Sequence, residues 1–185
     1  IRDARDGEPQ VGPRREHGGP PRPLRGDRWN HVARIVDTAA LRQRLREGSH
    51  EVIGYDPRPE VTDVPTIAAL AEALEAPRVV WVMVPHGAPT RDTVAQLAEL
   101  LDKGDLVIDG GNSKFTEDFE NEKLLKAKGI GYLDCGVSSG IWGLDNGYGL
   151  MVVGTATNVK KAMPIFDALR PEGPRSTLEG RADRP

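Results

Sequence analysis

Short apolar runs alternate with longer amphipathic segments along the middle of the chain. The runs have the length and β-branched content of strands, and they cover residues 51–56, 78–84, 106–108, 130–133 and 149–153. Between them, apolar residues recur at helical spacing in segments 67–74, 90–101, 116–128 and 156–169. Strands that alternate with helices are typical of βαβ units, which build a parallel sheet covered on both faces. We therefore expect an α/β domain with a doubly wound, mostly parallel sheet.

The start of the domain departs from this pattern. In the common strand order 3-2-1-4-5-6 the first strand is central, and a G-x-G-x-x-G turn follows it where a dinucleotide binds. The candidate first strand, residues 31–36, carries Arg34 in its middle, and no glycine occurs between Gly26 and Gly48. The helix predicted at 40–47 stops at Gly48, but the glycine fingerprint is absent. Two outcomes stay open: the domain is unstable, or this imperfect strand takes the central place.

Both ends of the chain differ from the middle. Arg, Gly and Pro supply 17 of residues 1–30 and eight of residues 171–185, so neither segment has enough apolar surface to offset the entropy of ordering. We expect disorder in both, which leaves residues 31–170 as the folded domain. One hypothesis is that the two ends arise from out-of-frame reading of a GC-rich gene; a gene sequence without family residues in its alternative frames would contradict it.

Composition excludes several classes of function. The net charge of −3 gives no concentrated basic surface for nucleic acid, and no apolar run approaches the length of a membrane span. A single cysteine excludes an internal disulfide, and the four histidines show no metal-ligand spacing. We expect a cytoplasmic protein without a metal, a membrane anchor or a nucleic-acid partner.

Three motifs carry a resemblance to a known family. VMVPHG at 82–87, IDGGNS at 108–113 and CGVSSG at 135–140 followed by GYGLM are similar to the cofactor-binding domain of decarboxylating 6-phosphogluconate dehydrogenase. The similarity covers about residues 41–169. It implies a Rossmann-like domain that binds NADP or NAD, and a family reaction that oxidises and decarboxylates 6-phosphogluconate to ribulose 5-phosphate in the pentose phosphate pathway. Full-length members are expected to be homo-oligomeric.

Candidate cofactor residues follow the predicted strands. Asp56 ends the second apolar run, where an acid binds the adenosine ribose, whereas an arginine such as Arg58 accommodates a 2′-phosphate. The choice between NAD and NADP therefore stays open, and so does a simple turn at Asp56. The turn Pro85-His86-Gly87 is implied by the resemblance to lie near the pyrophosphate and nicotinamide, although a lone turn histidine is more often incidental.

The resemblance assigns a second group of residues to the substrate. It implies that Asn112 contacts both the nicotinamide and the sugar acid, while a helix cap or Asx-turn is the structural alternative. Ser138, Ser139 and Gly140 are implied to bind substrate hydroxyls or carboxylate; Ser139 departs from the family's Ser-Gly-Gly. Cys135 is expected to be a small buried residue.

No catalytic residue is expected in this chain. The resemblance implies a lysine base and a glutamate acid on a helical domain that follows the cofactor domain, so we expect no turnover from this chain alone. Two alternatives remain: a non-catalytic fragment that acts only in association or binds a ligand weakly, and a related 3-hydroxyacid dehydrogenase.

Overall fold

The computed structural model describes residues 31–35, 39–111, 115–138 and 142–172. Its strands are β1 (His31–Ile35), β2 (Glu51–Tyr55), β3 (Val79–Val82), β4 (Leu106–Asp109), β5 (Gly131–Ser138) and β6 (Gly149–Gly154). Its helices are α1 (Ala39–Glu47), α2 (Ile67–Glu72), α3 (Ala88–Leu100), α4 (Phe115–Ala127), α5 (Gly143–Asn146) and α6 (Ala156–Leu169). The segments expected to be disordered, 1–30 and 171–185, lie outside the described residues except for Pro171 and Glu172.

One six-stranded sheet organises the domain, in the order β2-β1-β3-β4-β5-β6. All pairs are parallel except β5 with β6, which confirms the expected doubly wound, mostly parallel α/β sheet. β1 lies between β2 and β3, so the imperfect first strand does take the inner position.

The expected order 3-2-1-4-5-6 is wrong for this chain. The described chain has no strand outside β2, and the strand that follows it in sequence lies on the other side of β1. The cause is the connection from residue 56 to residue 66, which makes bends and turns and contains Pro57, Pro59 and Pro65. Proline removes a backbone donor and fixes φ, which disfavours both a helix and a strand there. β2 is consequently an edge strand.

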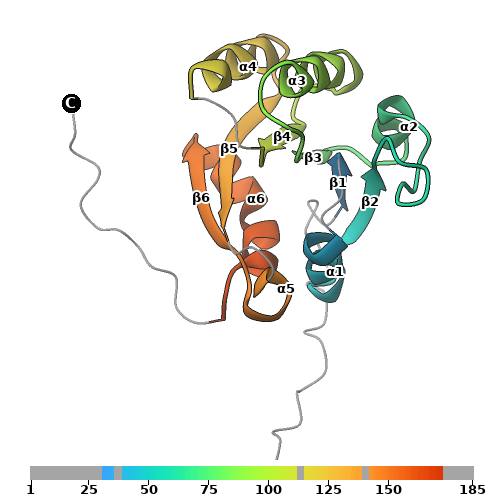
Figure 1. Cartoon of the computed structure of the whole chain (residues 1–185). Helices are drawn as coiled ribbons and strands as arrows, with labels where there is room; N and C mark the ends of the chain where they lie inside the picture. The colour runs from blue at the N-terminus through green and yellow to red at the C-terminus, as the bar shows by residue number, and fades with distance from the viewer. Residues whose placement is uncertain (1–30, 36–38, 112–114, 139–141, 173–185) are drawn as a thin grey trace, which may run out of the picture.

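Helices cover the sheet in two layers (Figure 1). On one face, α2, α3 and α4 pack on a core that includes Val80, Val82 and Val107; on the other, α1 and α6 pack on a core that includes Trp81 and Ile108. β3 and β4 are buried along their whole length, as expected for strands covered on both faces. None of the described helices has the length and apolar character to cross a bilayer.

The outer edge of β2 is closed by side chains and by a loop. The carboxylate of Asp63 accepts from Gly54 N at 2.8 Å, and Asp63 N donates to Gly54 O at 2.9 Å. Arg46 Nη2 donates to Val52 O at 3.0 Å, and Asp56 N donates to Thr62 Oγ1 at 3.2 Å. These bonds satisfy backbone groups that a neighbouring strand would otherwise pair.

Three local expectations need correction. β5 continues through Ser138, beyond the strand predicted at residues 130–133, because β6 pairs with residues 133–138 and bonds their backbone. On α4, Phe119 and Leu124 are exposed although their spacing predicted a core face, and Leu125 alone of this apolar set is buried there. Pro164, which favours a kink or a restart, lies inside the continuous helix α6.

Candidate functional site

The carboxyl ends of β2, β3, β4 and β5 lie at one edge of the sheet, because these strands are all parallel to β1 or to one another. Ligands of doubly wound sheets bind in the crevice outside this edge. The candidate residues that follow β2, β3 and β4 therefore face a common region. Asn112, Ser139 and Gly140 belong to the same candidate set but lie outside the described residues.

Asp56 and Arg58 form a compact turn after β2. Asp56 is buried, and its Oδ1 accepts from both Arg58 N and Arg58 Nε at 2.9 Å. Its Oδ2 accepts from Arg58 Nη2 at 3.0 Å, so the guanidinium binds the carboxylate through two parallel hydrogen bonds. The side chain of Arg58 is 57% exposed. The arginine therefore partly neutralises the acid while it stays accessible to a ligand.

The turn Pro85-His86-Gly87 connects β3 to α3. Gly87 is the residue before α3 and has φ of 90°, a conformation that favours glycine. The hydroxyl of buried Thr90 donates to Pro85 O at 2.9 Å and fixes the turn to the first turn of the helix. The side chain of His86 is exposed. The position of the turn at the carboxyl edge agrees with the expected cofactor contact but does not show it.

The turn after β4 is held by a buried carboxylate. Asp109 is fully buried, and its Oδ1 accepts from Gly111 N at 3.0 Å. Gly110 N donates to Val82 O at 2.7 Å, which extends the β3–β4 pairing by one residue. A Cβ on Gly110 would collide with Trp81 Nε1 and the sulfur of Met83, so glycine is required for the close approach. This turn leads directly to residue 112.

Tyr132 and Asp134 of β5 lie beside Asp109. The Tyr132 hydroxyl donates to Asp109 Oδ2 at 3.2 Å, and Asp134 is the register partner of Asp109. Burial, and next the negative charge of Asp109, raise the pKa of Asp134, although a hydrogen bond from Cys135 N opposes the shift. The carboxyl edge thus contains two neighbouring carboxylates, one of them held by a tyrosine.

The residues near the end of β5 have separate roles. Ser138 is the last residue of β5 and is exposed, paired with Gly149 of β6. Since Asp109 pairs with Asp134, Ser138 lies four residues beyond the level at which β4 ends. Cys135 is fully buried, and burial raises the pKa of its thiol to about 12, with a further contribution from Asp134. The cysteine is therefore a packing residue, as expected, and not a nucleophile.

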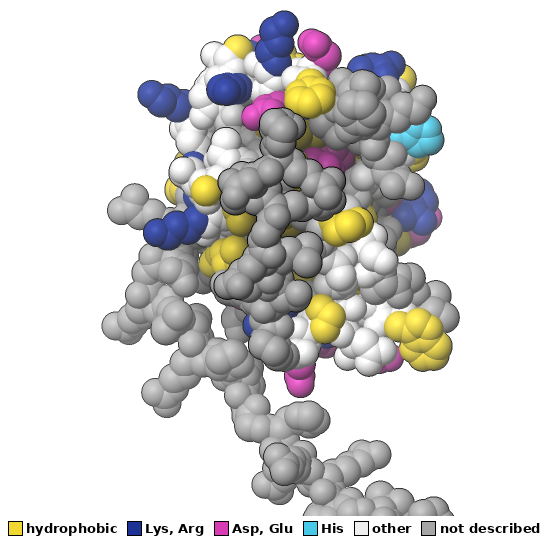
Figure 2. Space-filling view, turned by 90° about the vertical axis from the view of Figure 1, so that its left-hand side faces the viewer, with side chains coloured by type: hydrophobic (Ala, Val, Ile, Leu, Met, Phe, Trp, Pro, Cys, Tyr) yellow, Lys and Arg dark blue, Asp and Glu magenta, His cyan; other side chains and the backbone are white. Residues whose placement is uncertain are grey.

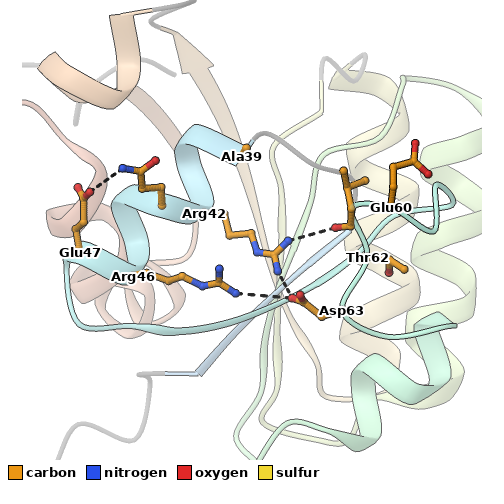
Figure 3. A pocket seen from close by; sticks show the side chains of 9 residues that line it. Ala39, Arg42, Arg46, Glu47, Glu60, Thr62 and Asp63 are labelled. Atoms are coloured by element: carbon orange, nitrogen blue, oxygen red, sulfur yellow. Dashed lines mark hydrogen bonds and ion pairs between the residues drawn. The ribbon is translucent and has the colours of Figure 1, made fainter.

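Two hollows border the second strand. One, of about 350 Å³, is lined by Asp56 together with Tyr55, Thr62 and three prolines. The other, of about 670 Å³, lies between α1 and the loop at residues 60–63 (Figure 3). In it Arg42 donates to Val61 O at 3.3 Å and pairs with Asp63, which Arg46 also approaches at 3.8 Å. The basic face of α1 is thus tied to this loop.

Sequence reasoning missed the residues that support the site. Asp109 was part of a recognised motif but had no assigned role, although an acid directly after a continuous apolar strand is a usable signal. Asp63 and Tyr132 gave no local signal, because their partners are nine and 23 residues away. Of the residues near α5, Tyr148 packs in the core, whereas Trp142 is 63% exposed. The described residues contain no cluster of three or more His, Cys, Asp or Glu that could hold a metal ion.

Comparisons with known sequences identify relatives of this domain. Residues 39–171 match the family described as the NAD binding domain of 6-phosphogluconate dehydrogenase. The decarboxylating 6-phosphogluconate dehydrogenase of Raoultella terrigena is 33% identical over 132 residues, which are 71% of this chain and 30% of the relative. That of Escherichia coli K12 is 34% identical over 129 residues, 70% of this chain and 28% of the relative. The chain therefore spans about three tenths of the length of these relatives.

Solved structures agree on the fold. The 3-hydroxyisobutyrate dehydrogenase of Mycobacterium tuberculosis superposes with a TM-score of 0.69 at 24% identity, over 76% of this chain and 52% of the other. The 6-phosphogluconate dehydrogenase of Plasmodium falciparum, solved with its cofactor NADP+ and with its substrate, superposes with a TM-score of 0.58 at 25% identity, over 76% and 29%. The fold is thus that of Rossmann-like dehydrogenases, and the sequence match decides between them. The chain belongs to the family of the NAD binding domain of 6-phosphogluconate dehydrogenase.

Proposed function

We propose that the chain binds NADP or NAD along the carboxyl edge of its sheet, as the cofactor domain of a 6-phosphogluconate dehydrogenase. The carrying observation is the convergence of three structured turns at that edge: Asp56 with Arg58, residues 85–87, and residues 109–111. Each turn is fixed by a side-chain hydrogen bond, so the edge is organised before any ligand arrives. Preorganised loops at this edge are what a dinucleotide requires.

The residues at this edge fit the ribose and nicotinamide portions of the cofactor better than the pyrophosphate. α1 has no acid in its first turn and begins with the small residues Ala39 and Ala40, which suits a phosphate at a helix N-terminus. The sequence at 36–38 is Val-Asp-Thr, however, where the family fingerprint has glycines, and it lies outside the described residues. We therefore expect weaker binding than a complete fingerprint would give.

NADP is the cofactor that the turn after β2 favours. Arg58 occupies both oxygens of Asp56, which a ribose diol would otherwise use as acceptors. The same guanidinium is more than half exposed and suits a 2′-phosphate, since arginine binds phosphate through planar, paired donors.

The reaction that we propose for the whole protein is the oxidative decarboxylation of 6-phosphogluconate to ribulose 5-phosphate. A bound cofactor accepts the hydride in this chemistry. Asn112, with His86 and its turn, contacts the cofactor; Asn112, Ser138, Ser139 and Gly140 contact the sugar acid. The catalytic lysine and glutamate belong to the helical domain of the family, so this chain alone binds cofactor without turnover.

Thermal unfolding with added NADP+ or NAD+ tests the proposal, because a ligand at free concentration L that binds only the folded state stabilises it by RT ln(1 + L/Kd) and so raises Tm as its concentration increases. We expect Tm to rise progressively with cofactor concentration up to the millimolar range, and no oxidation of 6-phosphogluconate unless the helical domain of a relative is added. The absence of any shift at millimolar cofactor would favour the alternative of a non-catalytic fragment. Turnover by the chain alone would contradict the assignment of the catalytic groups.

A related 3-hydroxyacid dehydrogenase is the second candidate, since 3-hydroxyisobutyrate dehydrogenase shares the fold. That likeness shows the fold alone, whereas the relatives at 33–34% identity are 6-phosphogluconate dehydrogenases. Titration of the cofactor-bound chain with 6-phosphogluconate and with 3-hydroxyisobutyrate separates the two. A rise in Tm with 3-hydroxyisobutyrate but not with 6-phosphogluconate would assign the chain to the 3-hydroxyacid dehydrogenases.

A further inference from the structure

Thr62 lies in the loop that follows the turn after β2. Its hydroxyl oxygen accepts from Asp56 N at 3.2 Å and donates to Val64 O at 2.6 Å, with Gly54 O further away at 3.5 Å. A hydroxyl has one hydrogen to donate, so the short bond to Val64 fixes its direction and leaves a lone pair for Asp56 N. The hydroxyl therefore connects the start of the turn with the end of the loop.

Asp63 holds the same loop to the outer edge of β2. Gly54 N donates to its carboxylate at 2.8 Å, and Asp63 N donates to Gly54 O at 2.9 Å. Arg42 of α1 pairs with that carboxylate and donates to Val61 O at 3.3 Å (Figure 3). Thr62 is thus fixed between two anchored neighbours, so its hydroxyl has a defined place before any ligand binds.

The hydroxyl of Thr62 acts on Arg58 through Asp56. Asp56 is 3% exposed, and its carboxylate binds the guanidinium of Arg58 through Nε and Nη2. Because the acid is buried, the position of its backbone sets where the guanidinium lies. The hydrogen bond from Asp56 N to Thr62 therefore supports the arginine that we expect to bind a 2′-phosphate.

The surroundings of this turn are polar, in contrast to the surface at the other edge strand. β6 exposes Met151 and Val153, and hydrophobic side chains, in yellow, lie on that side of the molecule in Figure 2. At β2, hydroxyl, carboxylate and guanidinium groups border the two hollows. An edge with this chemistry suits a charged ligand, and the exposed guanidinium of Arg58 suits an anion.

We propose that Thr62 is a positioning residue that gives the chain a preference for NADP over NAD, by acting through Asp56 and Arg58. This inference rests on the proposed binding of the cofactor at the carboxyl edge, with the 2′-phosphate on Arg58. NAD has no phosphate at that position, so its binding does not depend on where the guanidinium lies. Loss of the hydroxyl should consequently weaken the binding of NADP alone, whereas a general disturbance of the fold would affect both cofactors.

Isothermal titration of the full chain with NADP+ and NAD+ tests this role in Thr62→Val, which keeps the shape of the side chain without its hydroxyl. We expect the Kd for NADP+ to rise about fivefold and that for NAD+ to change by less than about twofold. Thr62→Ser should bind NADP+ as the unaltered chain does, because it keeps the hydroxyl. Thr66→Val is the matched control: the Thr66 hydroxyl also accepts from a backbone amide, Ala69 N at 3.0 Å, but at the start of α2. We expect the control to leave both Kd values unchanged.

A double-mutant cycle shows whether Thr62 acts through Arg58. In the Arg58→Ala background, Thr62→Val should cause no further loss of NADP+ affinity, because the guanidinium that it positions is gone. The inference alone would be overturned by losses that add in the double variant, or by Thr62→Val leaving the Kd for NADP+ unchanged or raising both Kd values equally. If the unaltered chain bound neither cofactor, the proposed function would fail, and this inference with it.

Hydrogen exchange in the unaltered chain keeps the test decisive if Thr62→Val folds poorly. Coupling between two sites is reciprocal, so a phosphate held by Arg58 should in turn strengthen the bond from Asp56 N to Thr62. At equal saturation, we expect the amide of Asp56 to exchange more slowly with NADP+ than with NAD+, and the amide of Ala69 to exchange equally with both. Equal exchange of the Asp56 amide with the two cofactors would refute the positioning role.

Discussion

The Tyr132 hydroxyl donates to Asp109 Oδ2 at 3.2 Å, from a neighbouring strand and 23 residues further along the chain. The same carboxylate accepts from Gly111 N, so the tyrosine supports the turn that leads to the candidate ligand residue 112. A buried carboxylate that loses a donor keeps its desolvation cost without the compensating bond.

Tyr132→Phe tests this support. We expect a loss of about 1–3 kcal/mol in the free energy of unfolding, because buried Asp109 loses one donor. Urea denaturation measures it. Tyr55→Phe is the control, since Tyr55 packs against the core and the described residues show no hydrogen bond from its hydroxyl. Equal losses in the two variants would mean that the Tyr132 hydroxyl contributes nothing specific.

Asp134→Asn should make the protein more stable at neutral pH. Burial and the charge of Asp109 raise the pKa of Asp134, so the folded state binds its proton more tightly than the unfolded state does. Its contribution to stability is thus greatest at low pH and is lost as the pH rises from the ordinary value of 3.8 through the raised pKa. The free energy of unfolding should be measured for both proteins from pH 3 to pH 8. As the pH rises, the variant should become increasingly more stable than the unaltered chain. A stability difference between the two proteins that stays constant over this pH range would contradict the raised pKa of Asp134.

Asp63→Asn should act in the opposite direction. Burial alone raises the pKa of Asp63, but the hydrogen bond from Gly54 N and the charges of Arg42 and Arg46 outweigh it, so the pKa is lowered. The stabilisation is present above the ordinary value of 3.8 and is lost as the pH falls through the lowered pKa. We expect the variant to be less stable at pH 7 and to lose less on acidification, as followed by thermal unfolding. Asp92→Asn, at an exposed acid of α3, is the control.

Gly110→Ala should destabilise the fold by about 1–3 kcal/mol, because the new methyl group meets Trp81 and Met83 in a packed core. Gly136→Ala is a useful comparison: its methyl group would meet the end of exposed Met151, at 3.2 Å, which can move aside. Chemical denaturation of both variants measures the difference. Similar small losses at the two positions would show that the β4 turn is not tightly packed.

Arg58→Ala should reduce the affinity for NADP+ by about tenfold and leave that for NAD+ nearly unchanged, since a lost charged hydrogen bond costs roughly 1.5–3 kcal/mol. Isothermal titration of both cofactors measures the ratio. Arg91→Ala, at an exposed arginine of α3, is the control. An equal loss of affinity for both cofactors would show that Arg58 only stabilises the turn and does not bind the 2′-phosphate.

The βαβ unit from β4 to β5 was predictable, because two continuous apolar strands and the helix between them are local patterns. The length of β5 was not, since residues 134–138 resemble a turn and become strand only through pairing with β6. The strand order was also hidden: the prolines after β2 mark a loop, but sequence periodicity does not show that β2 thereby becomes an edge.

At the candidate site, the sequence indicated which strand ends meet but not what holds them. Asp56 and Arg58 were identified as alternatives for two cofactors, whereas the structure pairs them in one turn. The support from Thr90, Tyr132 and Asp109 depends on distances in space, which residue spacing does not encode. The assignments of Asn112, Ser139 and Gly140 remain predictions.

Arg44 of α1 joins the first and the last helices of the domain. Its guanidinium donates to Leu144 O at 2.9 Å, to Leu169 O at 3.2 Å and to Arg170 O at 3.1 Å, up to 126 residues further along the chain. These partners follow Arg44 by 100 to 126 residues, so α1 leaves the ribosome long before its guanidinium can be satisfied. A nascent chain must therefore carry an incompletely docked first helix until residue 170 emerges.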